Sequence, residues 1–225
     1  AMGETTEVLK KKAEKNADAL LKIAVLEFNS GCEWIQPLGP EDLEDFIWSD
    51  LSAGGLTDMG EALKELDSKL SRDQFLSSST GAYLPIIIFM TDGFATDNYK
   101  KALQQIRRNK WFAHAVKIGL ALGDYPDIAM IAEIVGSVEA VVATSNLEVF
   151  ERLVQFLSQT SAVLCSSSST EQDRVTGSDI VKRAVREGVA PKEAVDINIP
   201  NLPKPPVPGY DIRDEDIDEW DDDFF

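Results

Sequence analysis

Two loops of the sequence carry hydroxyl and carboxylate oxygens that could bind an ion. The first loop has paired glycines followed by a threonine and an aspartate, and reads Gly54-Gly55-Leu56-Thr57-Asp58. The second loop follows a strongly apolar stretch and contains Asp92-Gly93 and, five positions after the first aspartate, Asp97. Hydroxyl and carboxylate oxygens, without histidine or cysteine nearby, are the ligands that hard cations such as Mg²⁺ prefer. The two loops therefore predict a site for a divalent cation.

Each loop also has a simpler interpretation. Thr57 and Asp58 are of the types that cap helix N-termini, and Asp92-Gly93 is a common turn. A carboxylate pair from Asp92 and Asp97 would instead suit a Mg²⁺-dependent enzyme that acts on phosphate groups. No nucleotide-binding glycine motif, serine elbow or Asp-x-Asp motif accompanies that pair. His114 is the only histidine, which disfavours zinc clusters and Ser-His-Asp triads, and it is expected to be a packed residue in a strand.

Alternating strands and helices must position these loops. Strands are predicted from short apolar runs at 22–28, 84–90, 113–122 and 140–143, with a strand at 32–35 that completes a hairpin with the first. Helices are predicted at 4–21, 60–70, 99–109, 128–135 and 147–157. This alternation indicates an α/β fold with a doubly wound, mostly parallel sheet flanked by helices. Ligands bind such sheets beyond the carboxyl ends of the strands, where both loops lie.

The composition is that of an acidic globular protein. The 225 residues include 22 Lys plus Arg and 39 Asp plus Glu, which gives a net charge of −17 at pH 7. This charge argues against nucleic acid as a partner, because phosphate binding needs a basic surface. No apolar run approaches the roughly 18 residues of a membrane span, the N-terminus lacks signal-peptide features, and two cysteines are too few for a disulfide framework. We therefore expect a cytoplasmic protein without membrane contact.

A serine-rich stretch divides the chain into a body and a tail. We expect a domain over residues 1–164, a flexible linker over 165–178 and an acidic, proline-containing tail over 179–225. A short helix is predicted at 179–187 and would dock on the body or on a neighbour. The tail ends in carboxylates interrupted by three aromatic residues, Trp220, Phe224 and Phe225. This end is either solvated or a peptide that anchors its rings in a basic partner.

Four segments of the body resemble the von Willebrand factor A (VWA) domain family. They are the strand KIAVLEFN at 22–29, the loop GGLTDMGEAL at 54–63, the strand and turn IIIFMTDG at 86–93, and the strand end IGLALG at 118–123. The resemblance covers about residues 1–160, and the second and third segments are its most specific motifs. Among the branches of the family, the sequence is most similar to the bacterial intracellular type associated with tellurite resistance.

The VWA family builds its metal-ion-dependent adhesion site (MIDAS) from three loops. An Asp-x-Ser-x-Ser motif follows the first strand, a threonine comes from a second loop and an aspartate from a third. The resemblance implies that Thr57 and Asp92 are the threonine and the aspartate, and that they would hold Mg²⁺ or another divalent cation. It also implies a loop-shaping or supporting role for Gly54, Gly55, Asp58 and Gly93.

The Asp-x-Ser-x-Ser motif is absent from this sequence, and so is the strand before it. In the family that strand lies in the centre of the sheet, between the strands that begin here near Lys22 and Leu84. Three explanations are open: the chain is a fragment, the segment 194–199 fills the gap, or a partner donates a strand. We favour a fragment, because a tail strand would need an unusual crossover. With only two protein oxygens, the chain is expected to bind Mg²⁺ poorly.

The resulting hypothesis is a non-catalytic protein-interaction module. A metal at the carboxyl end of the sheet would complete its coordination with an acidic residue of a partner, and the acidic-aromatic tail would add a second contact. The resemblance implies a partner such as a kinase, a phosphatase or a ring-shaped ATPase. Two alternatives stay open: the phosphate-handling enzyme that uses Asp92 and Asp97, and a scaffold that needs no metal and binds only through its tail.

Overall fold

The computed structural model describes most of the body and one segment of the tail. The described residues are 22–36, 38–42, 45–47, 55–77, 85–123, 125–146, 148, 149, 152, 153, 155–157, 160 and 175–195. Several predictions fall on other residues: the helix at 4–21, Gly54, the linker up to residue 174, and the tail aromatics Trp220, Phe224 and Phe225 all lie outside the described part of the chain.

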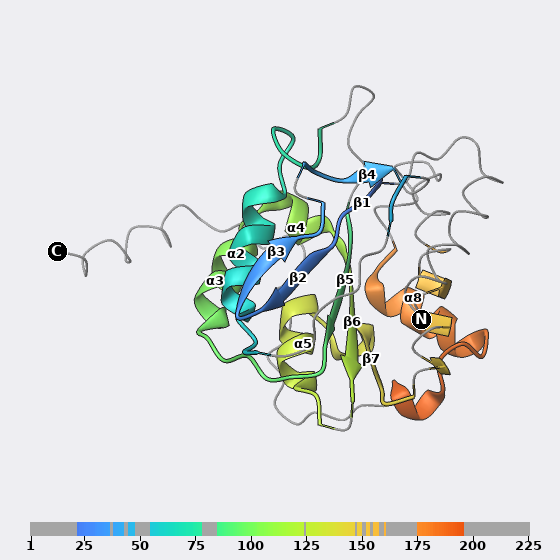
Figure 1. Ribbon diagram of the computed structural model, residues 1–225. Helices are drawn as coiled ribbons and strands as arrows, with labels where there is room; N and C mark the ends of the chain where they lie inside the picture. The colour runs from blue at the N-terminus through green and yellow to red at the C-terminus, as the bar shows by residue number, and fades with distance from the viewer. Residues whose placement is uncertain are drawn as a thin grey trace, which may run out of the picture.

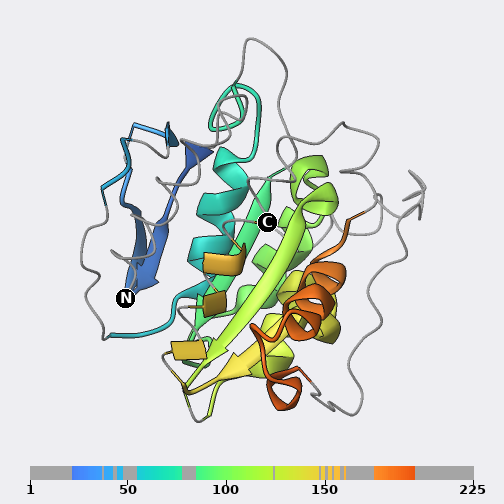
Figure 2. The same cartoon turned by 90° about the vertical axis from the view of Figure 1, so that its right-hand side faces the viewer.

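The described strands form a parallel sheet and two antiparallel pairs. The parallel sheet has the order β5 (Ile86–Thr91), β6 (Val116–Leu122), β7 (Val141–Thr144). A hairpin joins β2 (Leu26–Asn29) to β3 (Gly31–Trp34), and β1 (Lys22–Ile23) pairs with β4 (Glu41–Asp42). The hairpin lies beyond β5, on the side of the sheet away from β7 (Figures 1 and 2). The hairpin therefore lies next to β5, and β6 lies between β5 and β7.

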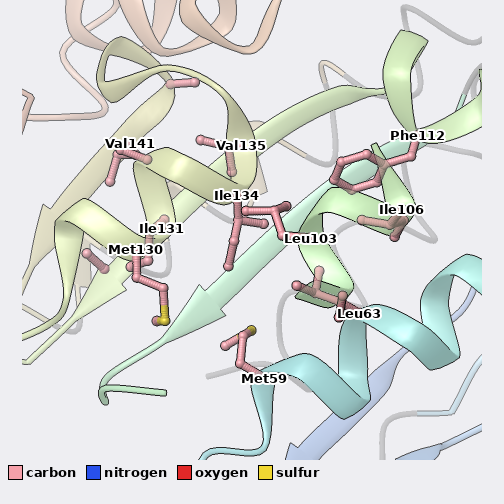
Figure 3. Close-up of a cluster of buried hydrophobic side chains, with 14 of the residues drawn as sticks. Met59, Leu63, Leu103, Ile106, Phe112, Met130, Ile131, Ile134, Val135 and Val141 are labelled. Atoms are coloured by element: carbon pink, nitrogen blue, oxygen red, sulfur yellow. The ribbon is translucent and has the colours of Figure 1, made fainter. Parts of the chain in front are cut away.

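One face of the sheet is covered by the helices between the strands. These are α2 (Met59–Lys69), α3 (Tyr99–Ile106), α4 (Lys110–His114) and α5 (Ile128–Val135). Figure 3 shows their buried side chains, among them Met59, Leu103 and Met130, packed into one cluster. Ile87 and Phe89 of β5 pack against this cluster because alternate residues of a strand point to the same face.

The opposite face is covered by residues that come later in the chain. Helix α8 (Gly177–Arg186) contacts β6 and β7, and its Ile180 and Val181 are buried with Ile118 of β6. Val149 and Leu153, from the part of the predicted 147–157 helix that is described, belong to the same cluster. The 3-10 turn η2 (Lys192–Ala194) adds Ala194 to this cluster, whereas Ala140 of the turn η1 (Val138–Ala140) belongs to the cluster on the first face. The mixed α/β class, with a parallel sheet between helical layers, is confirmed.

Two elements differ from the sequence predictions. The strand predicted at 113–122 begins only at Val116, and the preceding residues form α4, whose N-terminus is capped by Asn109 accepting from the backbone N–H of Trp111. His114 therefore ends a helix and is not in a strand. The strand predicted at 22–28 is interrupted at Ala24 and Val25. There the backbone N–H of Val25 donates to a side-chain oxygen of the buried Gln36.

Helix α8 begins two residues earlier than predicted and docks on the body of the protein. Thr176 and Asp179 form a capping box, which satisfies the first backbone N–H groups of the helix. The described start of the segment 194–199, at η2, contacts β7, and residues 196–199 lie outside the described part of the chain. No helix among the described residues is long and apolar enough to cross a membrane.

Candidate functional site

Three loops meet at the carboxyl end of β5. They are the hairpin turn at 29–31, the loop at 55–58 that leads into α2, and the loop at 91–97 after β5. The backbone N–H of Thr57 donates to Thr96 Oγ1 at 2.9 Å, and the backbone N–H of Thr96 donates to the carbonyl of Thr57 at 2.9 Å. The N–H of Asp58 donates to the carbonyl of Asn29 at 3.0 Å. These hydrogen bonds hold residues far apart in the sequence in one small region.

Thr57 lies beside the Asp92-Gly93 turn. A Cβ atom built on Gly93 would lie 3.1 Å from Thr57 Oγ1, so the threonine hydroxyl occupies the space next to the glycine. Asp92 is exposed and directly follows the buried Thr91, whose Oγ1 accepts a hydrogen bond from the N–H of Gly93 at 3.2 Å. The structure therefore places Thr57 beside the turn that contains Asp92, and the absence of a side chain on Gly93 leaves room for the threonine hydroxyl.

Asp58 connects the loops and does not cap the helix that follows it. Its Oδ2 accepts from the backbone N–H of Gly31 at 2.8 Å, and its Oδ1 accepts from Thr96 Oγ1 at 3.3 Å. The Asp58 side chain makes no capping hydrogen bond to α2. The simple interpretation of this aspartate as a helix cap is therefore wrong, and its position is that of a carboxylate supporting the loops.

The capping function for α2 comes from the other loop. Both oxygens of Asp97 accept from the backbone N–H of Gly60, at 2.8 and 2.9 Å, and Oδ2 also accepts from Glu61 at 3.2 Å. A carboxylate at a helix N-terminus also interacts favourably with the helix dipole. Sequence reasoning missed this role because Asp97 and Gly60 are 37 positions apart, and capping motifs are recognised only at short spacing.

Gly55 shapes the first loop around the hairpin turn. Its φ of 87° is a left-handed conformation that favours glycine. The next residue, Leu56, donates its backbone N–H to Ser30 Oγ at 3.1 Å. Ser30 therefore contacts the first loop. Like the capping role of Asp97, this contact was not found in the sequence analysis.

The electrostatic environment beside the loops is negative. Cys32, in the hairpin, has its thiol pKa raised by burial and then by the carboxylates of Glu61, Glu65 and Asp58. Carboxylates that disfavour a thiolate also favour a nearby cation, because both effects follow from the same local potential. The described residues nevertheless contain no group of three or more His, Cys, Asp or Glu side chains that could hold a metal ion. Thr57 and Asp92 alone supply two oxygen donors.

Exposed apolar side chains surround this region. Leu56 is 57% exposed, and Phe94, two residues after Asp92, is 60% exposed. Tyr125, 85% exposed, follows the end of β6, where a Cβ atom on Gly123 would lie 4.0 Å from Asp92 Cβ. Large apolar groups exposed together around a polar centre are typical of surfaces that bind other proteins.

Comparisons with known proteins found similar solved structures only. No family model matches the chain, and no curated protein matches it. Structures of proximal thread matrix protein 1 from the mussel byssus are similar: one has 15% sequence identity and a TM-score of 0.48 over 69% of this chain. A structure of that protein with a zinc-occupied MIDAS motif has 18% identity and a TM-score of 0.47, also over 69% of this chain. This chain spans 42–43% of the length of those proteins.

Proposed function

We propose that this chain is a non-catalytic protein-interaction module of the VWA type, whose partner surface is formed by the loops at 55–58 and 91–97. The observation that carries the proposal is the position of Thr57 Oγ1 next to the Asp92-Gly93 turn, 3.1 Å from where a Gly93 Cβ would lie. The two residues come from separate elements, yet the loops that hold them are joined by backbone hydrogen bonds. Such preorganisation is what a binding site needs and a pair of unrelated turns would lack.

A divalent cation, Mg²⁺ in the first instance, would be held by the Thr57 hydroxyl and the Asp92 carboxylate. Both are hard oxygen donors, and Mg²⁺ is commonly bound by one or two protein carboxylates with the remaining positions filled by water. The cation would give the surface a positive centre for an acidic residue of a partner. Two protein donors imply weak binding by the chain alone, so the partner would contribute part of the coordination.

The exposed apolar residues would supply the rest of the contact. Leu56 and Phe94 flank the two donors and are more than half exposed. Aromatic and large aliphatic side chains near the centre of an interface contribute most of the binding energy in many complexes. The identity of the partner, whether kinase, phosphatase or ATPase, and the contribution of Trp220, Phe224 and Phe225 in the tail stay predictions.

The alternative of a phosphate-handling enzyme has less support. That hypothesis needs the Asp97 carboxylate free to act with Asp92. Both Asp97 oxygens instead accept hydrogen bonds from the N-terminus of α2. Replacing such contacts with a substrate or a metal would leave the helix N–H groups of Gly60 and Glu61 without their partner.

Paramagnetic broadening by Mn²⁺, used in place of Mg²⁺, tests the proposed cation site. Mn²⁺ added to the ¹⁵N-labelled chain is expected to broaden the amide signals of Thr57, Asp92 and Gly93 first, at concentrations in the millimolar range expected for few ligands. Excess Mg²⁺ should restore the signals by competition. Asp92→Asn should abolish the effect, because the amide lacks the negative charge that attracts the ion.

Asp97→Asn is the matched control, because the same loop loses one charge while an oxygen remains to accept from the α2 amides. This variant should keep the broadening near Asp92. Broadening that is uniform over the acidic surface, or that survives Asp92→Asn unchanged, would show that Mn²⁺ is only attracted by the net charge. Broadening that disappears equally in both variants would contradict a role specific to Asp92.

A further inference from the structure

Helix α3 has a basic outer face. Its residues Ala102, Leu103 and Ile106 are buried in the core, so the opposite side of the helix faces solvent. The exposed basic side chains are Lys100, Lys101 and Arg108, with Lys110 following at the start of α4. In α3 they are separated by one, seven or eight positions, which places them on one side of a helix with 3.6 residues per turn. We call Lys100, Lys101, Arg108 and Lys110 the basic face.

This face is a local excess of positive charge on an acidic protein. The net charge of the chain is −17 at pH 7, yet no Asp or Glu occurs from Asn98 to Gly123. With the carboxylates of the described residues, Lys100, Arg108 and Lys110 form no salt bridge. The positive charge of these three side chains is therefore available for a negatively charged group from elsewhere.

The carboxylates that the neighbouring helices direct at α3 are bound to uncharged groups. Asp67 of α2 accepts from Gln105 Nε2 at 3.0 Å and from Asn109 Nδ2 at 2.9 Å. Glu133 of α5 accepts from the hydroxyl of Tyr99 at 2.8 Å. These contacts fix the flanks of α3 to its neighbours and leave the basic face between them.

The sequence 211–225 has a composition complementary to this face. These residues lie outside the described part of the chain, and they include nine Asp or Glu, one Arg and three aromatic residues. Complementary charge favours encounter and fixes register, and aromatic rings pack on guanidinium groups and on the aliphatic stems of lysine. The basic face already offers such packing at its edge, where the guanidinium of Arg72 lies 5.8 Å from the centre of the half-buried Trp111 ring.

The acidic segment is tethered to the same molecule. The basic face lies on the layer opposite α8 (Figure 1). The 23 residues from Val195 to Asp218 span about 75 Å when extended, compared with roughly 40 Å across a domain of this size. A flexible tether also gives an effective concentration in the millimolar range. A polyanion from outside would instead have to approach a protein with a net charge of −17.

We propose that residues 211–225 bind the basic face of α3 and α4 within the same molecule. Their carboxylates would pair with Lys100, Arg108 and Lys110, and their rings would pack on the stems of these side chains and on Trp111. The contact needs neither a cation nor the loops at 55–58 and 91–97, so it goes beyond the proposed function and is tested separately. Because exposed ion pairs are weak and screened, salt should release the segment.

Paramagnetic broadening from a label in the acidic segment tests the contact in the full chain. A nitroxide is attached at Ile217→Cys after Cys32→Ser and Cys165→Ser, which leaves every charge and ring of the segment in place. The amide signals of α3 are expected to lose at least half of their intensity, and those of α8 much less. Sodium chloride at about 0.5 M should restore them, because the Debye length falls to about 4 Å.

Two charge-reversed chains distinguish the basic face from general attraction. Lys100→Glu combined with Arg108→Glu should reduce the broadening at α3 at least threefold. Arg186→Glu combined with Lys192→Glu is the matched control, because it makes the same charge change at exposed positions of the opposite layer and should leave the broadening at α3 unchanged. Equal broadening at α3 in both chains, or broadening spread evenly over the surface, would overturn the proposal.

A mixed sample separates contact within one molecule from contact between two copies. The spin-labelled chain without ¹⁵N is mixed with a ¹⁵N-labelled chain that carries no nitroxide. The signals of α3 should stay sharp in this mixture and broaden only when the label and the isotope are in one molecule. Broadening in the mixture would mean that the basic face binds the segment of a second copy, and would contradict the proposal. Absence of broadening at α3 in both samples would contradict it as well.

Discussion

Lys117 is a charged side chain inside the sheet layer. It belongs to β6, and its Nζ donates to the carbonyls of Phe112 at 2.7 Å and Ala115 at 3.0 Å, where α4 ends. The ammonium also lies 4.9 Å from the centre of the Phe112 ring. Burial, and secondarily the positive charge of Arg107, lower the pKa of Lys117 from 10.5 to about 8. The folded state therefore disfavours the charged form that the unfolded state prefers.

This shift makes the stability of the protein depend on pH. Below pH 8 both states hold the proton, and the full cost of burying the charge is present. Between pH 8 and 10.5 the folded state has lost the proton that the unfolded state still binds, so the free energy of unfolding rises with pH. The rise expected between pH 7 and 9.5 is about 1–2 kcal/mol.

Chemical denaturation at pH 7 and pH 9.5 measures this effect in the native chain and in Lys117→Met. The variant keeps the aliphatic stem and should lose the rise, whereas Lys100→Met controls for the loss of one exposed positive charge. Measurements stop at pH 9.5 because burial and the hydrogen bond to Glu133 raise the pKa of Tyr99. Unfolded-state ionisation of tyrosine above about pH 10 would then lower stability and mask the lysine. The same pH dependence in native chain and Lys117→Met would rule out the assignment.

Residue types pointed to the two loops that the structure brings together, but not to the contacts that the side chains in those loops make. Thr57 and Asp92 were singled out as oxygen donors that follow sheet elements, and the structure places Thr57 beside the Asp92-Gly93 turn. A supporting role for Asp58 was implied only by the family resemblance, and the capping role of Asp97 was not predicted, because each side chain acts across 27 or more positions of sequence. Local rules describe helix caps within about three residues, and a cap supplied by another loop leaves no local pattern.

Elements with strong periodicity were predicted well, and short apolar runs were not. β5, α2 and α5 match their predicted ranges within two residues, because long apolar runs and helical spacing each have one interpretation. The short, mostly apolar run from Trp111 to Val116 has two interpretations, because such a segment suits either a strand or a buried helix. Asn109, which caps α4, was the signal that decides for the helix.

The docking of α8 depends on a glycine at its first position. A Cβ atom on Gly177 would lie 1.9 Å from the carbonyl oxygen of Lys117 and 3.2 Å from Ala140 Cβ, so the helix backbone lies directly on the sheet. Gly177→Ala should therefore lower the free energy of unfolding by about 1–3 kcal/mol, as overpacking does elsewhere, despite the better helix propensity of alanine. Equilibrium denaturation measures the change.

Gly188→Ala serves as the control for this substitution. Gly188 follows the same helix with a φ of 72°, and nothing lies within 4 Å of an added Cβ atom. This variant carries only the backbone strain of a left-handed residue, about 1 kcal/mol. If Gly177→Ala lowers the free energy of unfolding by no more than Gly188→Ala does, the result would contradict the close contact between α8 and β6.

The whole molecule has two apolar layers, and the second depends on residues after the serine-rich stretch. Ile180, Val181 and Ala184 of α8 are buried in the cluster that covers β6 and β7, together with Ala190 and Ala194 near η2. The sequence analysis assigned this part of the chain to the tail, because the apolar positions of a single short helix do not reveal what the helix packs against. The boundary of the folded unit is therefore best determined by truncation.

A chain ending at Val195 and a chain ending at Leu164 should differ sharply in stability. The first keeps α8 and η2 and is expected to unfold at nearly the temperature of the full chain. The second exposes Ile118, Leu120 and Val142, and the loss of apolar burial, on the order of 5 kcal/mol, is comparable to the whole stability of many domains. Calorimetry and near-ultraviolet circular dichroism would detect the loss. A cooperative transition at an unchanged temperature in the shorter chain would show that residues 1–164 fold independently.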